Sequence, residues 1–190
     1  MPFTDSHCHL DFDEFAGSLP TLLAGCAQAD IQRIIIPGVQ PENWHKVLTL
    51  AQAEFAKPTC KLYAALGIHP WFLEGLSQRH LADLSQKVQD NRDKIVAIGE
   101  TGIDGVIARQ ENNLAQQQEF FDYQLQLAKD NQLPVIVHHR RSHQYILPLL
   151  KKAALTHNGI IHAFSGSYQE ALSYIELGFK LGIGGTITYP

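Results

Sequence analysis

Short runs of β-branched and apolar residues recur along the chain, and most of them end in glycine, histidine or glutamate. Seven such runs predict strands. They cover residues 3–9, 31–37, 62–69, 95–100, 134–138, 159–162 and 179–187. Amphipathic stretches separate the runs, so strand and helix alternate with little else. This alternation is typical of a parallel sheet covered by helices.

The intervening segments carry helix signals. The apolar spacing that follows Ser77 predicts a helix capped by that residue, and Phe121, Leu125 and Ala128 repeat the helical spacing. Residues 167–170 read Ser-Tyr-Gln-Glu, which has the form of a capping box. A helix should therefore begin there, and Gly178 stands where it should end.

Seven strands with six intervening helices fit either a doubly wound open sheet or a (β/α)₈ barrel that lacks its last pieces. Two observations favour the barrel. Chemically reactive residues follow many of the strands, which is where barrel active sites are built, and 190 residues fall short of the ~250 typical of that fold. We therefore expect one incomplete barrel domain over residues 1–190.

The composition is that of a globular protein, with 45% hydrophobic and 18% charged residues. The sequence has no long apolar run that would span a membrane and no basic, apolar leader. Its three cysteines, Cys8, Cys26 and Cys60, cannot all pair with one another and have no metal-binding spacing. Reduced thiols in a cytoplasmic protein are the expectation.

The formal net charge of −4 argues against tracking duplex DNA by neutralising phosphates, which usually needs a basic stripe. The densest basic patch is Arg140-Arg141, with Lys151-Lys152 farther on. A nucleic-acid substrate would therefore depend on local arginines and metal ions. The sequence has ten histidines and one methionine. Histidine is the commonest metal ligand and a frequent acid or base, so the positions of the histidines are informative.

Histidine and glutamate side chains stand at the ends of four predicted strands. His7 and His9 are two residues apart, so on a strand both imidazoles face one side and can hold one cation. Glu100 closes an apolar strand, where an unpaired charge would be costly, and His138 and His162 close two more. Four nitrogens and one carboxylate suit zinc or another borderline transition ion.

With these residues the sequence resembles the TatD family of metal-dependent hydrolases over essentially its whole length. The matching stretches are residues 5–10, 67–70, 99–104, 124–128, 133–140 and 162–166. Residues 140–143 (Arg-Arg-Ser-His) and the ending 184–190 are similar to the YjjV-type branch of that family. The resemblance implies a TIM-type (β/α)₈ barrel of the metallo-dependent hydrolase kind, here missing the last strand and helix.

The resemblance also implies the metal ligands. His7 and His9 would hold one divalent ion, His138 and His162 the other, and Glu100 would bridge them. Zinc, magnesium or manganese is expected as the metal. The family uses a further aspartate in a T-D-A/S-P type motif after strand 8, and no aspartate follows Asp130 in this sequence. The site is therefore expected to be one ligand short.

Further candidates surround these ligands. His69 is expected to act in catalysis or touch the substrate, although it could instead position its loop. Arg140 suits a phosphate group, or could brace Asp104 or Glu100. Asp104, expected in the loop after the fourth strand, could contact substrate or cap a helix. Asp5 could orient a ligating imidazole.

For the other aromatic and histidine residues, structural roles are also considered. His139 should point away from the site by strand alternation. Trp71 and Phe72 could stack a base or pack on the barrel rim. Four further histidines are expected to be solvated: His45, His80, His143 and His157.

The favoured function is deoxyribonuclease activity, in which two metal ions activate a water against a phosphodiester of DNA. Arg140 would then stabilise charge in the transition state. The alternatives are hydrolysis of a small-molecule C–N or ester bond, as in amidohydrolases, and an inactive truncated product. No membrane association and no obligate protein partner are expected.

Overall fold

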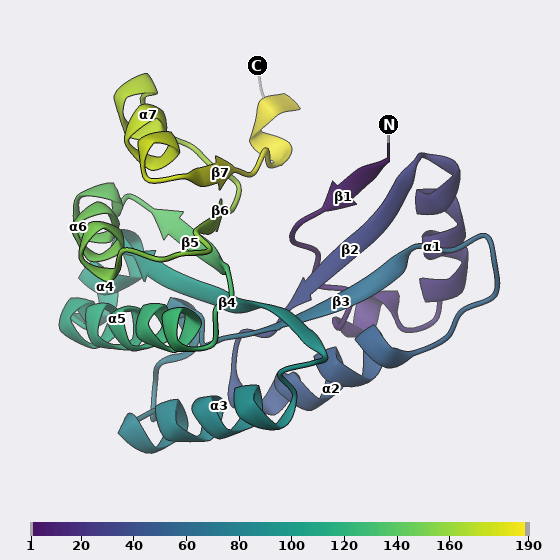
Figure 1. Ribbon diagram of the computed structural model, residues 1–190, viewed down its shortest axis with the longest axis horizontal. Helices are drawn as coiled ribbons and strands as arrows, with labels where there is room; N and C mark the ends of the chain where they lie inside the picture. Colours follow the sequence, from purple (N-terminus) through teal and green to yellow (C-terminus); the bar gives the residue numbers. More distant parts are fainter. Residues whose placement is uncertain (1, 189–190) are drawn as a thin grey trace.

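The structure is a computed structural model that describes residues 2–188. A single sheet of seven parallel strands follows the order of the chain from β1 to β7. The strands are β1 Phe3–Asp5, β2 Ile31–Pro37, β3 Lys61–Leu66, β4 Ile95–Asp104, β5 Val135–Arg140, β6 Gly159–Ile161 and β7 Phe179–Leu181. The sheet is curled, with β1 and β7 at its two ends (Figure 1).

Helices connect the strands and lie on the outer side of the curled sheet (Figure 1). The α-helices are α1 Leu19–Gln28, α2 Pro41–Gln52, α3 Gln78–Asp90, α4 Gly105–Glu111, α5 Leu114–Asp130, α6 His143–Ala153 and α7 Tyr168–Glu176. Short 3₁₀ helices are η1 Asp13–Phe15, η2 Pro70–Phe72 and η3 Gly185–Thr188. The described residues thus form the expected (β/α)₈ type of barrel with seven of its eight strands.

The helix signals in the sequence are confirmed. Ser77 is the N-cap of α3, and Ser167 caps α7 in a capping box with Glu170. Gly178, at φ +82°, follows the end of α7. The expected six connections are present, but the connection between β4 and β5 holds two helices, α4 and α5.

The apolar faces of the helices pack onto the sheet. The predicted helical spacings identify buried residues in α3 (Leu81, Leu84, Val88) and in α5 (Phe121, Leu125, Ala128), all fully buried. Burial of each large apolar side chain contributes roughly 1.5–3 kcal/mol. This packing holds the helices on the outer side of the sheet, so they do not cover its inner side.

Several predicted strands have different bounds. β3 ends at Leu66, before His69, and β7 ends at Leu181, where residues 69 and 187 were expected as the ends. Two further differences, at β1 and β4, affect the site. β1 ends at Asp5, so His7 and His9 lie in the loop after the strand instead of on it. β4 runs on beyond Glu100 and pairs with β5 as far as Asp104, opposite Arg140. Both changes move site residues along the rim of the sheet.

A hollow of about 1240 Å³ lies inside the curl of the sheet. Its lining comes from the strands, with Phe3, Ile31, Val135, Ile160 and Leu181 among the residues, and it contains none of the predicted metal-binding side chains. Among the described residues, none of the helices combines the length and apolar character that crossing a membrane requires.

Candidate metal centre

Glu100 stands at the centre of the site, and its two carboxylate oxygens face different histidines. Oε2 lies 3.2 Å from His7 Nε2 and 3.7 Å from His9 Nε2. Oε1 lies 3.3 Å from His138 Nδ1 and 3.6 Å from His69 Nε2. The side chain is only 3% exposed. A buried carboxylate is thus surrounded by imidazole nitrogens on both sides.

These contacts form two groups that share Glu100. One group contains His7 and His162, and the other contains His69 and His138; within each, the candidate ligand atoms lie within 4.8 Å of one another. The grouping differs from the expected one, which paired His138 with His162. His69, expected in catalysis or substrate contact, stands beside His138.

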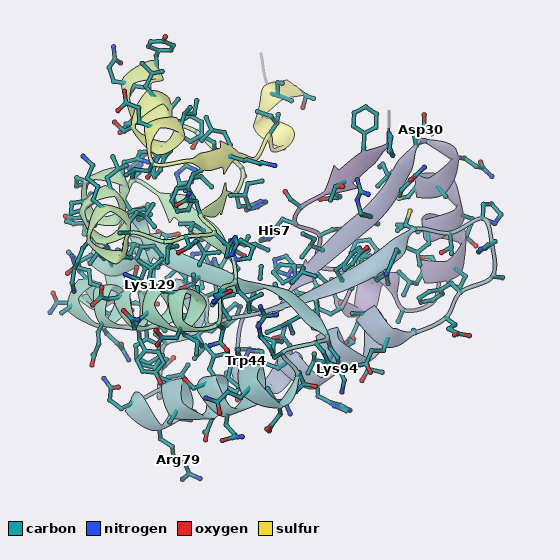
Figure 2. The ribbon with its side chains drawn as sticks, in the orientation of Figure 1. His7, Asp30, Trp44, Arg79, Lys94 and Lys129 are labelled. Carbon is teal, nitrogen blue, oxygen red and sulfur yellow. The ribbon has the colours of Figure 1, made fainter. Side chains whose placement is uncertain are left out.

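The close packing of histidines around Glu100 suits a divalent metal ion. The rings of His7 and His162 stack 3.5 Å apart at 14°, and His7 Nε2 lies 3.0 Å from His9 Nε2. Imidazoles this close repel one another if both are charged. A divalent ion instead needs neutral imidazole nitrogens and a carboxylate, so the residues present fit a metal ion. Figure 2 shows His7 on the inner side of the curled sheet, while Arg79 projects outward from α3.

The electrostatics of the site favour the same protonation states. Burial alone would raise the pKa of Glu100, but its contacts with His138, His7 and His9 hold that pKa well below the usual value. Burial lowers the pKa of His69 to about 3, and burial is also the largest cause that lowers the pKa of His162 to about 4. An ionised Glu100 with neutral imidazoles at His69 and His162 is in the state that binds metal.

The loop after β1 places His7 and His9 by local hydrogen bonds. Asp5 Oδ1 accepts from the backbone N–H of His7 at 3.0 Å, so Asp5 orients the backbone and not, as expected, an imidazole ring. The Cys8 N–H donates to Ile35 O at 3.0 Å, while the Cys8 side chain packs on the core. Burial raises the pKa of the Cys8 thiol to about 11. The two histidines therefore face the site, and the cysteine faces away.

Asp104 is the last residue of β4 and is fully buried, so the expectation of a loop position is wrong. Its Oδ1 accepts from the backbone N–H groups of Val106 and Ile107 and caps α4. Its Oδ2 lies 3.3 Å from His138 Nε2, on the opposite side of that ring from Glu100. Burial alone would lower the pKa of His138, but the two carboxylates raise it. Asp104 thus fixes which nitrogen of His138 faces Glu100.

Arg140 ends β5 at the rim of the site. Its side chain is 53% exposed, and one guanidinium nitrogen lies 3.9 Å from Asp104 Oδ2. The bracing contact with Asp104 that the sequence suggested is therefore present, at long range, and much of the guanidinium still faces solvent. An exposed guanidinium beside buried histidines is suited to oxygens of a bound phosphate.

Asp11 is a buried residue that the sequence reasoning missed. Asp11 Oδ1 and His9 Nδ1 are both buried without a hydrogen-bond partner among the described residues, and they face each other at 3.8 Å. Asn43 Nδ2 donates to Asp11 Oδ2 at 2.9 Å, and Asn43 Oδ1 accepts from the N–H groups of Val39 and Gln40. The start of α2 thus holds Asp11 against His9, whose Nε2 points toward Glu100.

We expect Asp11→Asn to weaken divalent metal binding about 10- to 100-fold, the range typical when a carboxylate that orients a metal-binding histidine is changed. An asparagine has one oxygen, so it cannot both accept from Asn43 and keep an anionic oxygen facing His9 Nδ1. Competition titration with a fluorescent zinc chelator measures the affinity. Asp13→Asn is the matched control, because Asp13 is exposed and pairs with Lys46. Equal affinities of the two variants would contradict an orienting role for Asp11.

Two buried glutamines from α5 hold the strand ends that carry site residues. Gln124 accepts from the N–H of Ile68 at 2.8 Å and donates to its carbonyl at 3.1 Å, directly before His69. Gln117 Oε1 accepts from the N–H of Asp104 at 2.8 Å. Both side chains are fully buried. Gln124 lies in one of the stretches that carried the family resemblance, which is the only sequence signal for it.

The remaining histidines divide in two. His139 is 7% exposed and lies away from Glu100, as expected, within 3.4 Å of the backbone N–H of Ser165. His143 was expected to be solvated but is buried, because its ring nitrogens bond the Tyr174 hydroxyl at 2.9 Å and the Ser165 carbonyl at 3.0 Å. His45 and His157 are exposed, and His80 completes the cap of α3.

Comparison with known proteins agrees with this geometry. Residues 4–190 match the family described as TatD related DNase. The chain is 44% identical over 188 residues to YjjV of Escherichia coli (strain K12), named an uncharacterized metal-dependent hydrolase, and this match covers 99% of the chain and 70% of YjjV. A crystal structure of YjjV superposes with a TM-score of 0.88 at 43% identity, covering 99% of this chain and 70% of that one.

A second relative has a more specific name. The protein named 3′-5′ ssDNA/RNA exonuclease TatD in Edwardsiella piscicida is 31% identical over 186 residues, which cover 96% of this chain and 68% of that protein. The matches extend over nearly the whole sequence and include the loop after β1, the end of β4 and the end of β5. The resemblance and the barrel fold expected from the sequence are thereby confirmed: the chain belongs to the TatD family of metal-dependent hydrolases.

Proposed function

We propose that this protein is a phosphodiesterase that hydrolyses DNA with two divalent metal ions. The observation that carries the proposal is Glu100, whose two oxygens face two separate groups of histidines. One carboxylate that can give an oxygen to each of two ions suits a hydrolase that uses two metal ions. The relative named as an exonuclease supports nucleic acid as the substrate class.

The proposed roles follow from position. The metal residues are His7, His9, Glu100, His138 and His162. His69, 3.6 Å from Glu100 Oε1, would reach an ion held by His138 or a substrate oxygen beside that ion. Two ions bound here would lower the pKa of an attacking water and polarise the phosphoryl oxygen.

The protein's own side chains complete the site. Asp104 holds the ring of His138 in place, and Arg140 offers its exposed guanidinium to a non-bridging phosphate oxygen, where it stabilises charge that grows in the transition state. Glu100 and His69 are buried, which strengthens the electrostatic interactions of these two side chains. Because the net charge is −4, binding of a DNA phosphate depends on these local groups and not on the overall charge.

The proposal is tested by stripping the protein of metal with a chelator and adding back zinc, manganese or magnesium singly. We expect release of nucleotides from end-labelled DNA with at least one metal and none in the chelator, and calorimetric titration should give two bound equivalents. An N-acylated amino acid and a cyclic amide, offered under the same conditions, report on amidohydrolase chemistry. Turnover of either amide without nucleotide release would overturn the proposed substrate class.

A further inference from the structure

Three exposed aromatic side chains contact the histidines of the metal centre. Phe12 is 46% exposed, Trp71 is 49% exposed and Phe72 is 37% exposed. The ring of Phe12 stacks on His9, with centroids 4.9 Å apart and 7° between the planes. The ring of Trp71 lies 5.5 Å from His69 and 6.2 Å from His138. Exposed aromatic rings thus stand on two sides of Glu100.

These rings lie where solvent reaches the site. Of the four histidines that contact Glu100, His9 and His138 have the most exposed side chains, at 22% and 15%, while His7 and His69 are at 6% and 7%. Phe12 stands beside His9, and Trp71 stands beside His138. The aromatic rings therefore lie beside the two histidines of this set that are most exposed to solvent.

Both rings are held in place despite their exposure. Trp71 Nε1 donates to Asp104 Oδ2 at 2.7 Å, and the Trp71 backbone N–H donates to His69 Nδ1 at 3.1 Å. The backbone of Phe12 is bonded at both ends, from its N–H to His9 and from Phe15 to its carbonyl. Fixed rings lose little conformational entropy when a ligand stacks on them.

We propose that Phe12 and Trp71 are stacking platforms for the unpaired bases on either side of the scissile phosphodiester. The inference rests on the proposed function and adds to it the side chains that would hold the bases; a single strand or an unpaired end agrees with the relative named as an ssDNA/RNA exonuclease. A base offers its face to an aromatic ring only when it is not stacked within a duplex. Arg140, exposed beside Asp104 on the Trp71 side, supplies the positive charge for the adjoining phosphate.

Charge distribution supports a single-stranded ligand. Stacking is sequence-tolerant and can supply affinity that a basic surface would otherwise provide. The chain has 15 basic against 19 acidic residues. It therefore has few basic side chains with which to neutralise the phosphates of a long duplex. Two aromatic rings and one arginine around a metal centre suit a short unpaired segment.

Binding of two labelled ten-residue oligomers tests the inference. One is oligothymidylate and the other has the same backbone without bases, and both carry phosphorothioate linkages that slow hydrolysis. By fluorescence anisotropy in the presence of metal, we expect Trp71→Leu and Phe12→Leu each to weaken binding of oligothymidylate roughly 5- to 150-fold. Binding of the abasic oligomer should be unchanged by either substitution.

Two further variants separate stacking from other causes. Trp71→Phe keeps an aromatic face but lacks the N–H that bonds Asp104, so it should retain most of the affinity for oligothymidylate. Phe3→Leu, which changes an exposed aromatic residue at the start of β1, should behave as the unmodified protein. In that protein, bound oligothymidylate should also quench the fluorescence of Trp71, since the second tryptophan, Trp44, is buried.

Equal losses for the two oligomers, or no loss for either, would overturn the stacking inference. So would a Trp71→Phe variant as weak as Trp71→Leu, because the hydrogen bond to Asp104 would then account for the effect. These outcomes concern binding alone. If DNA is hydrolysed but the substitutions change the binding of both oligomers equally, only the stacking inference fails. If no metal supports DNA hydrolysis, the proposed function fails.

Discussion

Glu100→Gln is expected to abolish both metal binding and hydrolysis while leaving the metal-free protein folded. A neutral amide cannot supply one anionic oxygen to each of two cations, so the several kcal/mol that metal ions give to the transition state are lost, a factor of about 10³ or more in kcat. Elemental analysis after dialysis measures the metal retained. Two retained equivalents would show that Glu100 does not bridge.

Thermal unfolding adds a readout that does not depend on catalysis. Metal at 100 times its Kd should raise the Tm of the unmodified protein by roughly 5–10 °C. The Tm of Glu100→Gln should not respond to metal. Without metal, the Tm of the two proteins should be close, because the carboxylate is 3% exposed and its burial as an ion offsets its contacts with the histidines. Glu54→Gln, at an exposed position after α2, serves as the matched control.

The sequence indicated the five residues that we propose as metal ligands for a physical reason. A carboxylate such as Glu100 at the end of an apolar strand is too costly to bury without a partner. Histidines at the ends of other parallel strands must lie along the same rim. Chain order and strand direction therefore bring His138 and His162 toward Glu100 before any distance is known. The structure places all five residues, with His69, around that carboxylate.

What the sequence could not predict depends on contacts between distant segments. Asn43 and Asp11 are 32 residues apart, and neither has a periodic signature. Their contact exists only because the start of α2 packs beside the loop after β1. The burial of His143 has a similar cause. His143 lies on α6 and is buried because Tyr174 on α7 packs against it. A histidine within an amphipathic stretch carries no sign of such a partner.

The strand bounds were wrong where side chains compete with the backbone ladder. The Asp5 carboxylate accepts a hydrogen bond from the backbone N–H of His7, so β1 stops before the histidines. At β4 the opposite occurs. The residues after Glu100 are not strongly apolar, yet they pair with β5 through Asp104. Gly102 makes this pairing possible, because it lies directly opposite His138.

Gly102→Ala is expected to destabilise the protein by about 4 kcal/mol or more, a loss seen only when a specific structural requirement is broken. Gly102 has a φ of +143°, which residues with a side chain rarely adopt, and an added Cβ would overlap the carbonyl oxygen of His138 and lie 3.0 Å from its amide nitrogen. These are backbone atoms of the neighbouring strand and cannot rotate away. The strands must separate, and His138 then moves out of the metal centre.

Gly25→Ala is the matched control, because Gly25 lies within α1 and no atom lies within 4 Å of the position its Cβ would take. Alanine should stabilise that helix by roughly 0.5–1 kcal/mol. Urea unfolding of both variants, with and without metal, measures the difference. We expect the midpoint of Gly102→Ala to fall far below that of the unmodified protein and to respond weakly to metal, since the displaced His138 no longer faces Glu100. A Gly102→Ala midpoint equal to that of Gly25→Ala would show that β4 and β5 do not need this close approach.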